Sequence, residues 1–88
     1  MNLQSEYAAM CAKLTPLAAP AMNIKQRESA EACIRAGEPY EALLDLLWAA
    51  AESNAPRNIL LDALALVDDE DKDQFHPLIK KRPNAPRS

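Results

Sequence analysis

Glycine, aromatic residues and strand-favouring residues are scarce in this sequence. The 88 residues include one glycine, and Phe, Trp and Tyr together make up 5% of the chain. Valine and threonine, which favour strands, occur once each, whereas alanine and leucine are abundant. Because alanine and leucine favour helix, the composition argues against a sheet. We therefore predict an all-α fold, a small bundle of four to five short helices with a core of Leu, Ile and Ala.

Positive charge is also in short supply. Ten Lys and Arg residues stand against thirteen Asp and Glu residues, which gives a net charge of -3. A negative chain repels phosphate backbones, so we expect no nucleic acid among its partners. The first residues, from Met1 on, form neither a basic nor an apolar leader, and no stretch is long enough to span a membrane. We expect a cytoplasmic protein with no membrane partner.

Residues that carry chemistry are few and scattered. Cys11 and Cys33 lack the spacing of a zinc site, and His76 is the single histidine, with no evident nucleophile near it in the sequence. In a chain without a leader, two cysteines on alanine-rich helical segments are most simply reduced core residues. We therefore predict that the protein is not an enzyme and that it holds no cofactor and no metal.

Proline, glycine and capping residues divide the chain into helices. Apolar residues recur at spacings of three and four from about residue 2 to residue 15, and Pro16 is expected to end that helix. The next helix can begin at Pro20 or at Asn23, which has Gln26 three residues on, as in a capping box. Gly37 ends it. Its inward-facing residues are predicted to be Ile24, Ala30, Cys33 and Ile34.

The second half of the chain supplies the stronger apolar faces. Pro39 suits the first turn of a third helix, whose wide apolar stripe should anchor the core. Pro56 opens a fourth helix that is apolar nearly all round, so it should be central or form half of an interface. Asp68 or Asp69 can cap a last helix, in which Pro77 interrupts the docking face. We predict one helical domain, residues 1–80, followed by a flexible basic tail, residues 81–88, that includes Lys81, Arg82 and Arg87.

Trp48 and the acidic residues near it allow two interpretations each. Trp48 is large enough to be a binding hot spot, but a single tryptophan in a small Ala and Leu bundle is more often a core residue. Glu38, Glu41, Asp45 and Glu52 lie on or beside the polar side of the third helix. They serve either ordinary solubility or an acidic contact surface.

A second acidic cluster spans residues 68–73. It lacks the central glycine and the terminal glutamate of a calcium-binding loop. The simpler interpretation is that Asp68, Asp69, Glu70 and Asp71 favour a helix N-terminus and stay solvated. The alternative is that they meet a basic protein surface, where dense negative charge would speed association and could mimic nucleic-acid phosphates at a nuclease site.

The turn between the second and third helices carries a family resemblance. The residues are Ile34, Arg35, Ala36, Gly37, Glu38 and Pro39, followed by Ala42, Leu43, Leu46 and Glu52. This stretch resembles the signature segment of the MafI-type immunity proteins, small bacterial proteins that neutralise secreted polymorphic toxins. The resemblance implies a non-enzymatic inhibitor that binds the toxic C-terminal domain of a neighbouring effector, often a nuclease.

Two hypotheses follow from these observations. The first is an immunity protein that binds a cognate toxin domain by acidic complementarity and steric occlusion. The second is a structural or regulatory helical adaptor, a secretion chaperone, or a homodimer that pairs through Leu60 and Leu64 of the fourth helix. For the first hypothesis the predicted partner-binding residues are Glu38, Glu41, Asp45, Asp68, Asp69, Glu70 and Asp71.

Overall fold

A computed structural model of the chain describes residues 3–80, which form five α-helices and one turn of 3₁₀ helix. No strand occurs among these residues, and the predicted all-α fold is confirmed. The elements in chain order are α1 (Leu3–Ala18), η1 (Ala19–Ala21), α2 (Ile24–Arg35), α3 (Pro39–Glu52), α4 (Arg57–Leu64) and α5 (Asp69–Lys80). The predicted basic tail, residues 81–88, lies outside the described residues.

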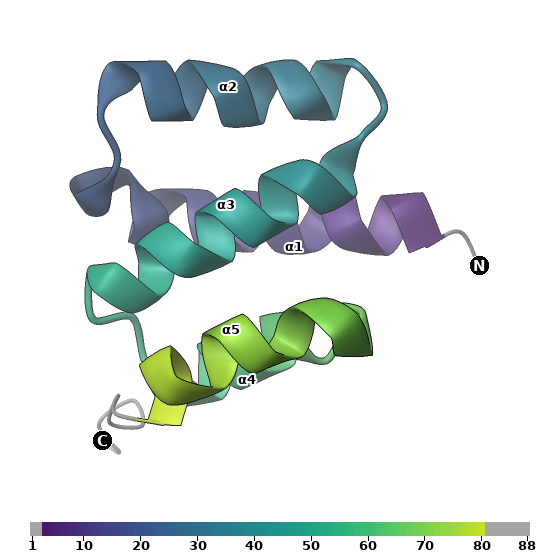
Figure 1. The fold of residues 1–88 in the computed structure, drawn as a ribbon. Coiled ribbons are helices and arrows are strands. Elements are labelled where there is room, and N and C mark those ends of the chain that lie inside the picture. Colours follow the sequence, from purple (N-terminus) through teal and green to yellow (C-terminus); the bar gives the residue numbers. More distant parts are fainter. Residues whose placement is uncertain (1–2, 81–88) are drawn as a thin grey trace.

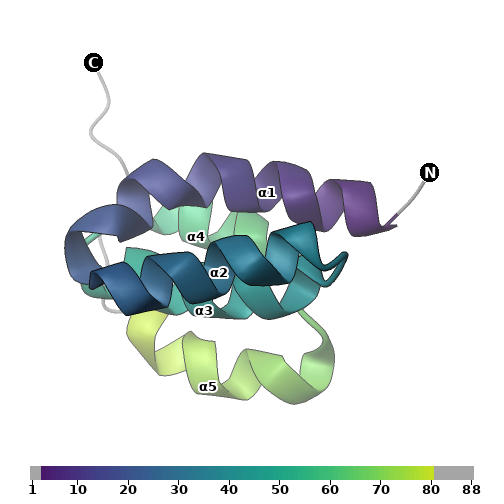
Figure 2. The same ribbon diagram turned by 90° about the horizontal axis from the view of Figure 1, so that it is seen from above.

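The helices form an up-and-down bundle in which consecutive helices run in opposite directions (Figure 1). As a result, α1, α3 and α5 all begin at the same end of the molecule. Seen from above, α2 lies over α3, with α1 on one side of α3 and α5 on the other (Figure 2). The central helix α3 packs against each of the other four helices, and its pairing with α1 is the most extensive. The prediction that this helix anchors the core is confirmed.

Small side chains and leucines fill the core, as the composition predicts. Four alanines of α3, Ala42, Ala49, Ala50 and Ala51, are buried, and small buried side chains let helix backbones approach closely. Tyr7 of α1 and Tyr40 of α3 close one end of this interface, with ring centroids 5.1 Å apart. The largest fully buried side chains are Leu14, Leu43, Leu47, Leu60, Phe75 and Ile79, with Cys11 beside them.

The two links that flank α3 end the preceding helices with left-handed residues. Gly37 has φ +79°, and the N–H of Glu38 donates to the carbonyl of Cys33 at 2.8 Å. Asn54 has φ +64°, and the N–H of Ala55 donates to the carbonyl of Ala50 at 3.0 Å. Both links satisfy carbonyls at a helix end in the manner of a Schellman motif. The predicted helix end at Gly37 is therefore confirmed.

Two prolines lie inside helices, and one of them, Pro16, does not end its helix as predicted. Pro16 lies inside the last turn of α1, and Pro77 lies inside α5. Each proline removes one backbone hydrogen bond, a loss of about 1 kcal/mol, but burial on both sides of it holds the helix together. Leu14 and Ala18 are buried around Pro16. The predicted end of the first helix at residue 15 is wrong.

The α2 helix is less buried than predicted. It begins with the predicted capping box, in which Asn23 and Gln26 bond reciprocally at 2.8 and 2.9 Å. Of the four residues expected to face inward, Ala30 is buried and Cys33 is half-buried, but Ile24 is 64% exposed and Ile34 is 37% exposed. The reason is that α2 packs mainly on α3 and sits at the outside of the bundle.

The short helix α4 buries two of its three leucines in the core of its own chain. Leu60 is fully buried and Leu64 is nearly so, whereas Leu61 is 45% exposed. A homodimer is therefore not needed to account for Leu60 and Leu64. The helix begins after Pro56, as predicted, and ends at Leu64.

Candidate functional site: an acidic end and an exposed tryptophan

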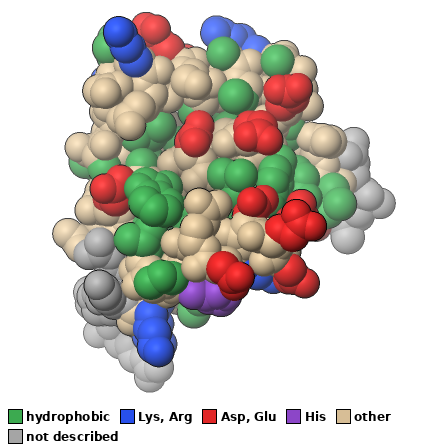
Figure 3. All heavy atoms as spheres, viewed as in Figure 1, with side chains coloured by type: hydrophobic (Ala, Val, Ile, Leu, Met, Phe, Trp, Pro, Cys, Tyr) green, Lys and Arg blue, Asp and Glu red, His purple; other side chains and the backbone are tan. Residues whose placement is uncertain are grey.

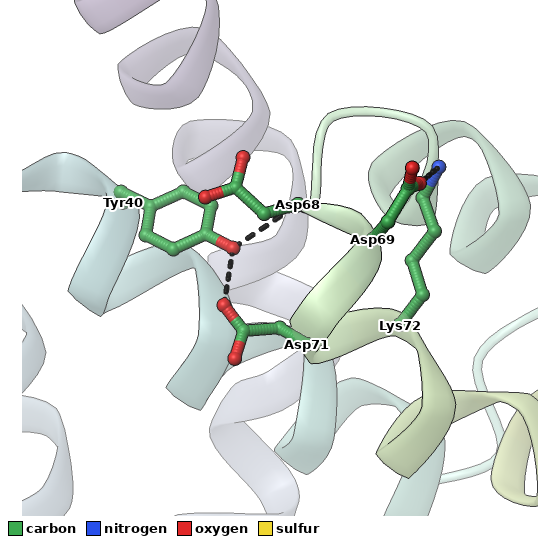
Figure 4. Close-up of polar contacts among 5 residues, drawn as sticks. All are labelled: Tyr40, Asp68, Asp69, Asp71 and Lys72. Carbon is green, nitrogen blue, oxygen red and sulfur yellow. Dashed lines mark hydrogen bonds and ion pairs between the residues drawn. The ribbon is translucent and has the colours of Figure 1, made fainter.

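Tyr40 ties the start of α3 to the start of α5. Its hydroxyl donates a hydrogen bond to Oδ2 of Asp71 at 2.6 Å and accepts one from the backbone N–H of Asp68 at 3.0 Å. Figure 4 shows the ring reaching from α3 to a position between these two aspartates. Burial, the bond to Asp71 and the nearby negative charges raise the pKa of Tyr40 to about 12, although the Asp68 N–H opposes this.

The hydrogen bonds of the Tyr40 hydroxyl to Asp68 and Asp71, which we call the Tyr40 joint, bring the two predicted acidic clusters to one end of the bundle. Tyr40 is in the first turn of α3, next to Glu38 and Glu41, and its hydroxyl contacts the beginning of the run from residue 68. The sequence does not reveal this proximity, because Glu41 and Asp68 are 27 positions apart in the chain. We call this region the acidic end and define it by Glu38, Glu41, Asp68, Asp69, Glu70 and Asp71.

The acidic end divides into carboxylates with partners and carboxylates without. Asp71 accepts the bond from Tyr40, and Asp69 forms an ion pair with Lys72 at 3.3 Å. An exposed pair of this kind contributes about 0.2–1 kcal/mol. Glu38, Glu41 and Glu70 are exposed and form no ion pair within residues 3–80. The predicted cluster therefore has one structural member, Asp71, whose carboxylate is already engaged.

Trp48 lies on the surface of α3, in line with acidic residues. It is 40% exposed, so the interpretation that it fills the core is wrong. Asp45 is three residues before it and Glu52 four residues after it, which places all three side chains on one helix face. Leu44 is half-buried beside them. We call this set, Leu44, Asp45, Trp48 and Glu52, the Trp48 face.

Trp48 and Asp45 both line hollows on two sides of α3. On one side the hollow reaches Met22 and Gln26, and on the other it reaches Gln74 and Phe75. The indole meets the ring of Phe75 edge-on, with centroids 5.9 Å apart and planes at 66°. This contact fixes one side of the indole against the bundle, in a favourable aromatic geometry.

Acidic and hydrophobic side chains alternate over this side of the molecule. Figure 3 shows acidic side chains across the middle and lower right of the view, with hydrophobic side chains between them. The Lys and Arg side chains visible in this view lie mostly near its upper and lower edges. Glu41 is four residues before Asp45, so it connects the acidic end to the Trp48 face along α3.

The predicted partner-binding residues include Glu38, Glu41 and Asp45. Glu52, which was weighed only as part of an acidic contact surface, and Leu44 were not among them. The spacing of residues 41, 45, 48 and 52 is the signal that could have added Glu52, since it marks one line along a helix. Leu44 is not in this line, and the spacing does not indicate it. This spacing did not change the prediction, because a single tryptophan in a small helical bundle is more often a core residue.

The residues considered for chemistry are dispersed. Cys11 and Cys33 are both free thiols; Cys11 is buried and donates to the carbonyl of Pro39 at 3.4 Å, and burial raises its pKa to about 11. His76 is exposed in a shallow hollow with Arg57 and Lys80. Residues 3–80 contain no group of three His, Cys, Asp or Glu side chains placed to hold a metal ion.

None of the helices within residues 3–80 is both long enough and apolar enough to cross a membrane.

Comparison of the chain with protein-family models, with curated proteins and with solved structures finds no match. The resemblance to the MafI-type immunity proteins therefore stays a prediction.

Proposed function

We propose that this protein is a non-enzymatic inhibitor of the immunity-protein type, which binds and neutralises the toxic domain of a bacterial effector in the cytoplasm. The observation that carries the proposal is the Trp48 face, where an exposed tryptophan stands between carboxylates that have no ion pair within residues 3–80. Tryptophan is among the residues most enriched at binding hot spots, and unpaired carboxylates beside it favour a cationic partner.

The acidic end adds long-range attraction to this contact surface. Glu38, Glu41 and Glu70 carry negative charge at the beginnings of α3 and α5, and the Trp48 face lies farther along α3. Such a field raises association rate constants from about 10⁵–10⁶ M⁻¹s⁻¹ toward 10⁸ M⁻¹s⁻¹ at low salt. A nuclease domain, whose substrate-binding surface is cationic, fits this charge. The inhibitor would act by covering that surface, so no reaction chemistry is required of it.

The test is binding to the protein encoded beside this one. We expect one-to-one binding by calorimetry, with an association rate that falls at least tenfold when the salt concentration rises from about 0.05 to 0.5 M, since added salt shortens the screening length. Charge reversal at both Asp45 and Glu70 should slow association further. Binding that is indifferent to salt and to both reversals would contradict the proposal.

The alternative function, a helical adaptor, a secretion chaperone or a homodimerisation module, predicts a different result. In all three versions the chain would not bind the neighbouring toxic domain, and in the homodimer version the free chain would also self-associate at micromolar concentration in a sedimentation experiment. Leu61, which is 45% exposed on α4, is the apolar side chain from that helix that a dimer could use. A clean monomer removes the homodimer version.

A further inference from the structure

The hollow between α2 and α3 has the composition of a site for one cationic side chain. It encloses about 190 Å³. Met22 and Ala49 are buried at its apolar base, Gln26 and Ser29 of α2 form one wall, and the Trp48 face forms the other.

The charges at this hollow are unbalanced. Asp45 and Glu52 stand on either side of Trp48 along α3, and neither forms an ion pair within residues 3–80. No Lys or Arg side chain lines the hollow. A group that enters it is therefore met by two carboxylates and an aromatic ring, and none of the described residues that line the hollow carries a positive charge.

The walls of the hollow are held in place before any ligand arrives. The side-chain oxygen of Gln26 accepts a hydrogen bond from the backbone N–H of Asn23 at 2.8 Å, as part of the capping box of α2. Trp48 is held by its edge contact with Phe75. Binding to a preformed hollow costs less conformational entropy than binding to a mobile one.

We infer that this hollow receives an arginine side chain from the partner protein, a conclusion that rests on the proposed function. A guanidinium group is planar and weakly hydrated, stacks on aromatic rings and bonds carboxylates through two N–H groups. The alkyl stem of the same side chain matches the apolar base formed by Met22 and Ala49. One arginine thereby uses the ring, the carboxylates and the base together.

Trp48 is the only tryptophan of the chain, so its fluorescence reports on the two hollows that the indole lines. Glu52 lines this hollow and not the one that reaches Gln74 and Phe75, so loss of the response in E52Q assigns the response to this hollow. The probe is the peptide acetyl-Gly-Arg-Gly-amide, and the control peptide carries citrulline, which has the same shape but no charge. At constant ionic strength we expect saturable change in Trp48 emission with the arginine peptide and about tenfold weaker binding of the citrulline peptide.

Matched variants separate local contacts from overall charge. The double variant D45N/E52Q should weaken binding of the arginine peptide about fivefold or more. The variant D62N/D73N removes the same charge from exposed positions that do not line the hollow, and it should bind almost as the original chain does. Circular dichroism and thermal melting establish that both variants fold.

The inference is overturned if the two peptides bind equally, if neither produces a saturable change, or if both double variants lose affinity alike. These outcomes are distinguishable from failure of the proposed function. Selective binding of the arginine peptide without binding of the neighbouring toxic domain would preserve the site and refute the immunity role. Binding of the toxic domain that D45N/E52Q leaves unchanged would preserve the role and refute the arginine site.

Discussion

Replacing Tyr40 by phenylalanine tests the joint between α3 and α5. The change keeps the ring, with its contact to Tyr7, and removes the hydroxyl that bonds Asp71 at 2.6 Å and Asp68 at 3.0 Å. A hydrogen bond to a charged group contributes about 1.5–3 kcal/mol and a neutral one about 0.5–1.5 kcal/mol. Because water can reach this joint and replace part of the loss, we expect Y40F to lower the free energy of unfolding by about 2 kcal/mol.

The assay is thermal and urea unfolding followed by circular dichroism. For a domain of this size, 1 kcal/mol corresponds to a change in Tm of roughly 4–8 °C, so Y40F should lower Tm by about 8–16 °C. Tyr7 offers the matched control, since its hydroxyl forms no hydrogen bond within residues 3–80. Y7F should change stability by less than about 0.5 kcal/mol.

A double-mutant cycle isolates the bond from other effects of Asp71. Asp71 also lies in the first turn of α5, where a negative charge is stabilising, so D71A alone removes two interactions. In the cycle of Y40F with D71A, the effect of the negative charge in the first turn of α5 cancels. The cycle should therefore return a coupling energy of about 1–2 kcal/mol for the Tyr40–Asp71 hydrogen bond. A Y40F variant as stable as Y7F, or a coupling energy near zero, would refute the reasoning.

Other perturbations test the rest of the fold. Gly37→Ala places a Cβ at φ +79° with no atom within 4 Å of it, so backbone strain alone should cost about 1–2 kcal/mol in urea unfolding. Leu60→Ala should cost about 2–5 kcal/mol and Leu61→Ala less than about 1 kcal/mol; equal losses would contradict the assigned burial. The raised pKa values of Cys11, from 9.0 to about 11, and Tyr40, from 10.0 to about 12, mean that the folded chain holds these protons longer than the unfolded chain. The contribution of these two groups to the free energy of unfolding should therefore be fully present below pH 9 and be lost between pH 9 and 12. Y40F should remove the part of this loss that occurs at the higher pH values, where Tyr40 titrates.

Local signals in the sequence were sufficient for most of the helix boundaries. Asn23 with Gln26, Gly37, and Pro39 each act within a few residues, and each is found where the pattern placed it. The predicted helix end at Pro16 was wrong because it rested on a local signal alone. Whether a helix continues past Pro16 depends on burial of Ala18 against another helix, which is a tertiary effect.

The candidate site was predictable in composition but not in arrangement. The acidic residues are evident in the sequence, but their meeting at one end depends on the parallel course of α3 and α5 and on the reach of Tyr40. The exposure of Trp48 also depends on tertiary structure. Gln26 and Ser29 of α2 leave a hollow beside the indole and do not cover it, which no periodicity along α3 could indicate.

The most direct test of the central claim is the indole signal of Trp48 in the presence of the neighbouring toxic domain. The chain contains one tryptophan, so the ¹⁵N-labelled protein gives one indole N–H signal, and an unlabelled partner adds none. We predict that this signal and the backbone signals of Asp45 and Glu52 shift on binding, more than those of Leu61 on α4. Binding that leaves the Trp48 signal unmoved and shifts Leu61 would contradict the proposed surface.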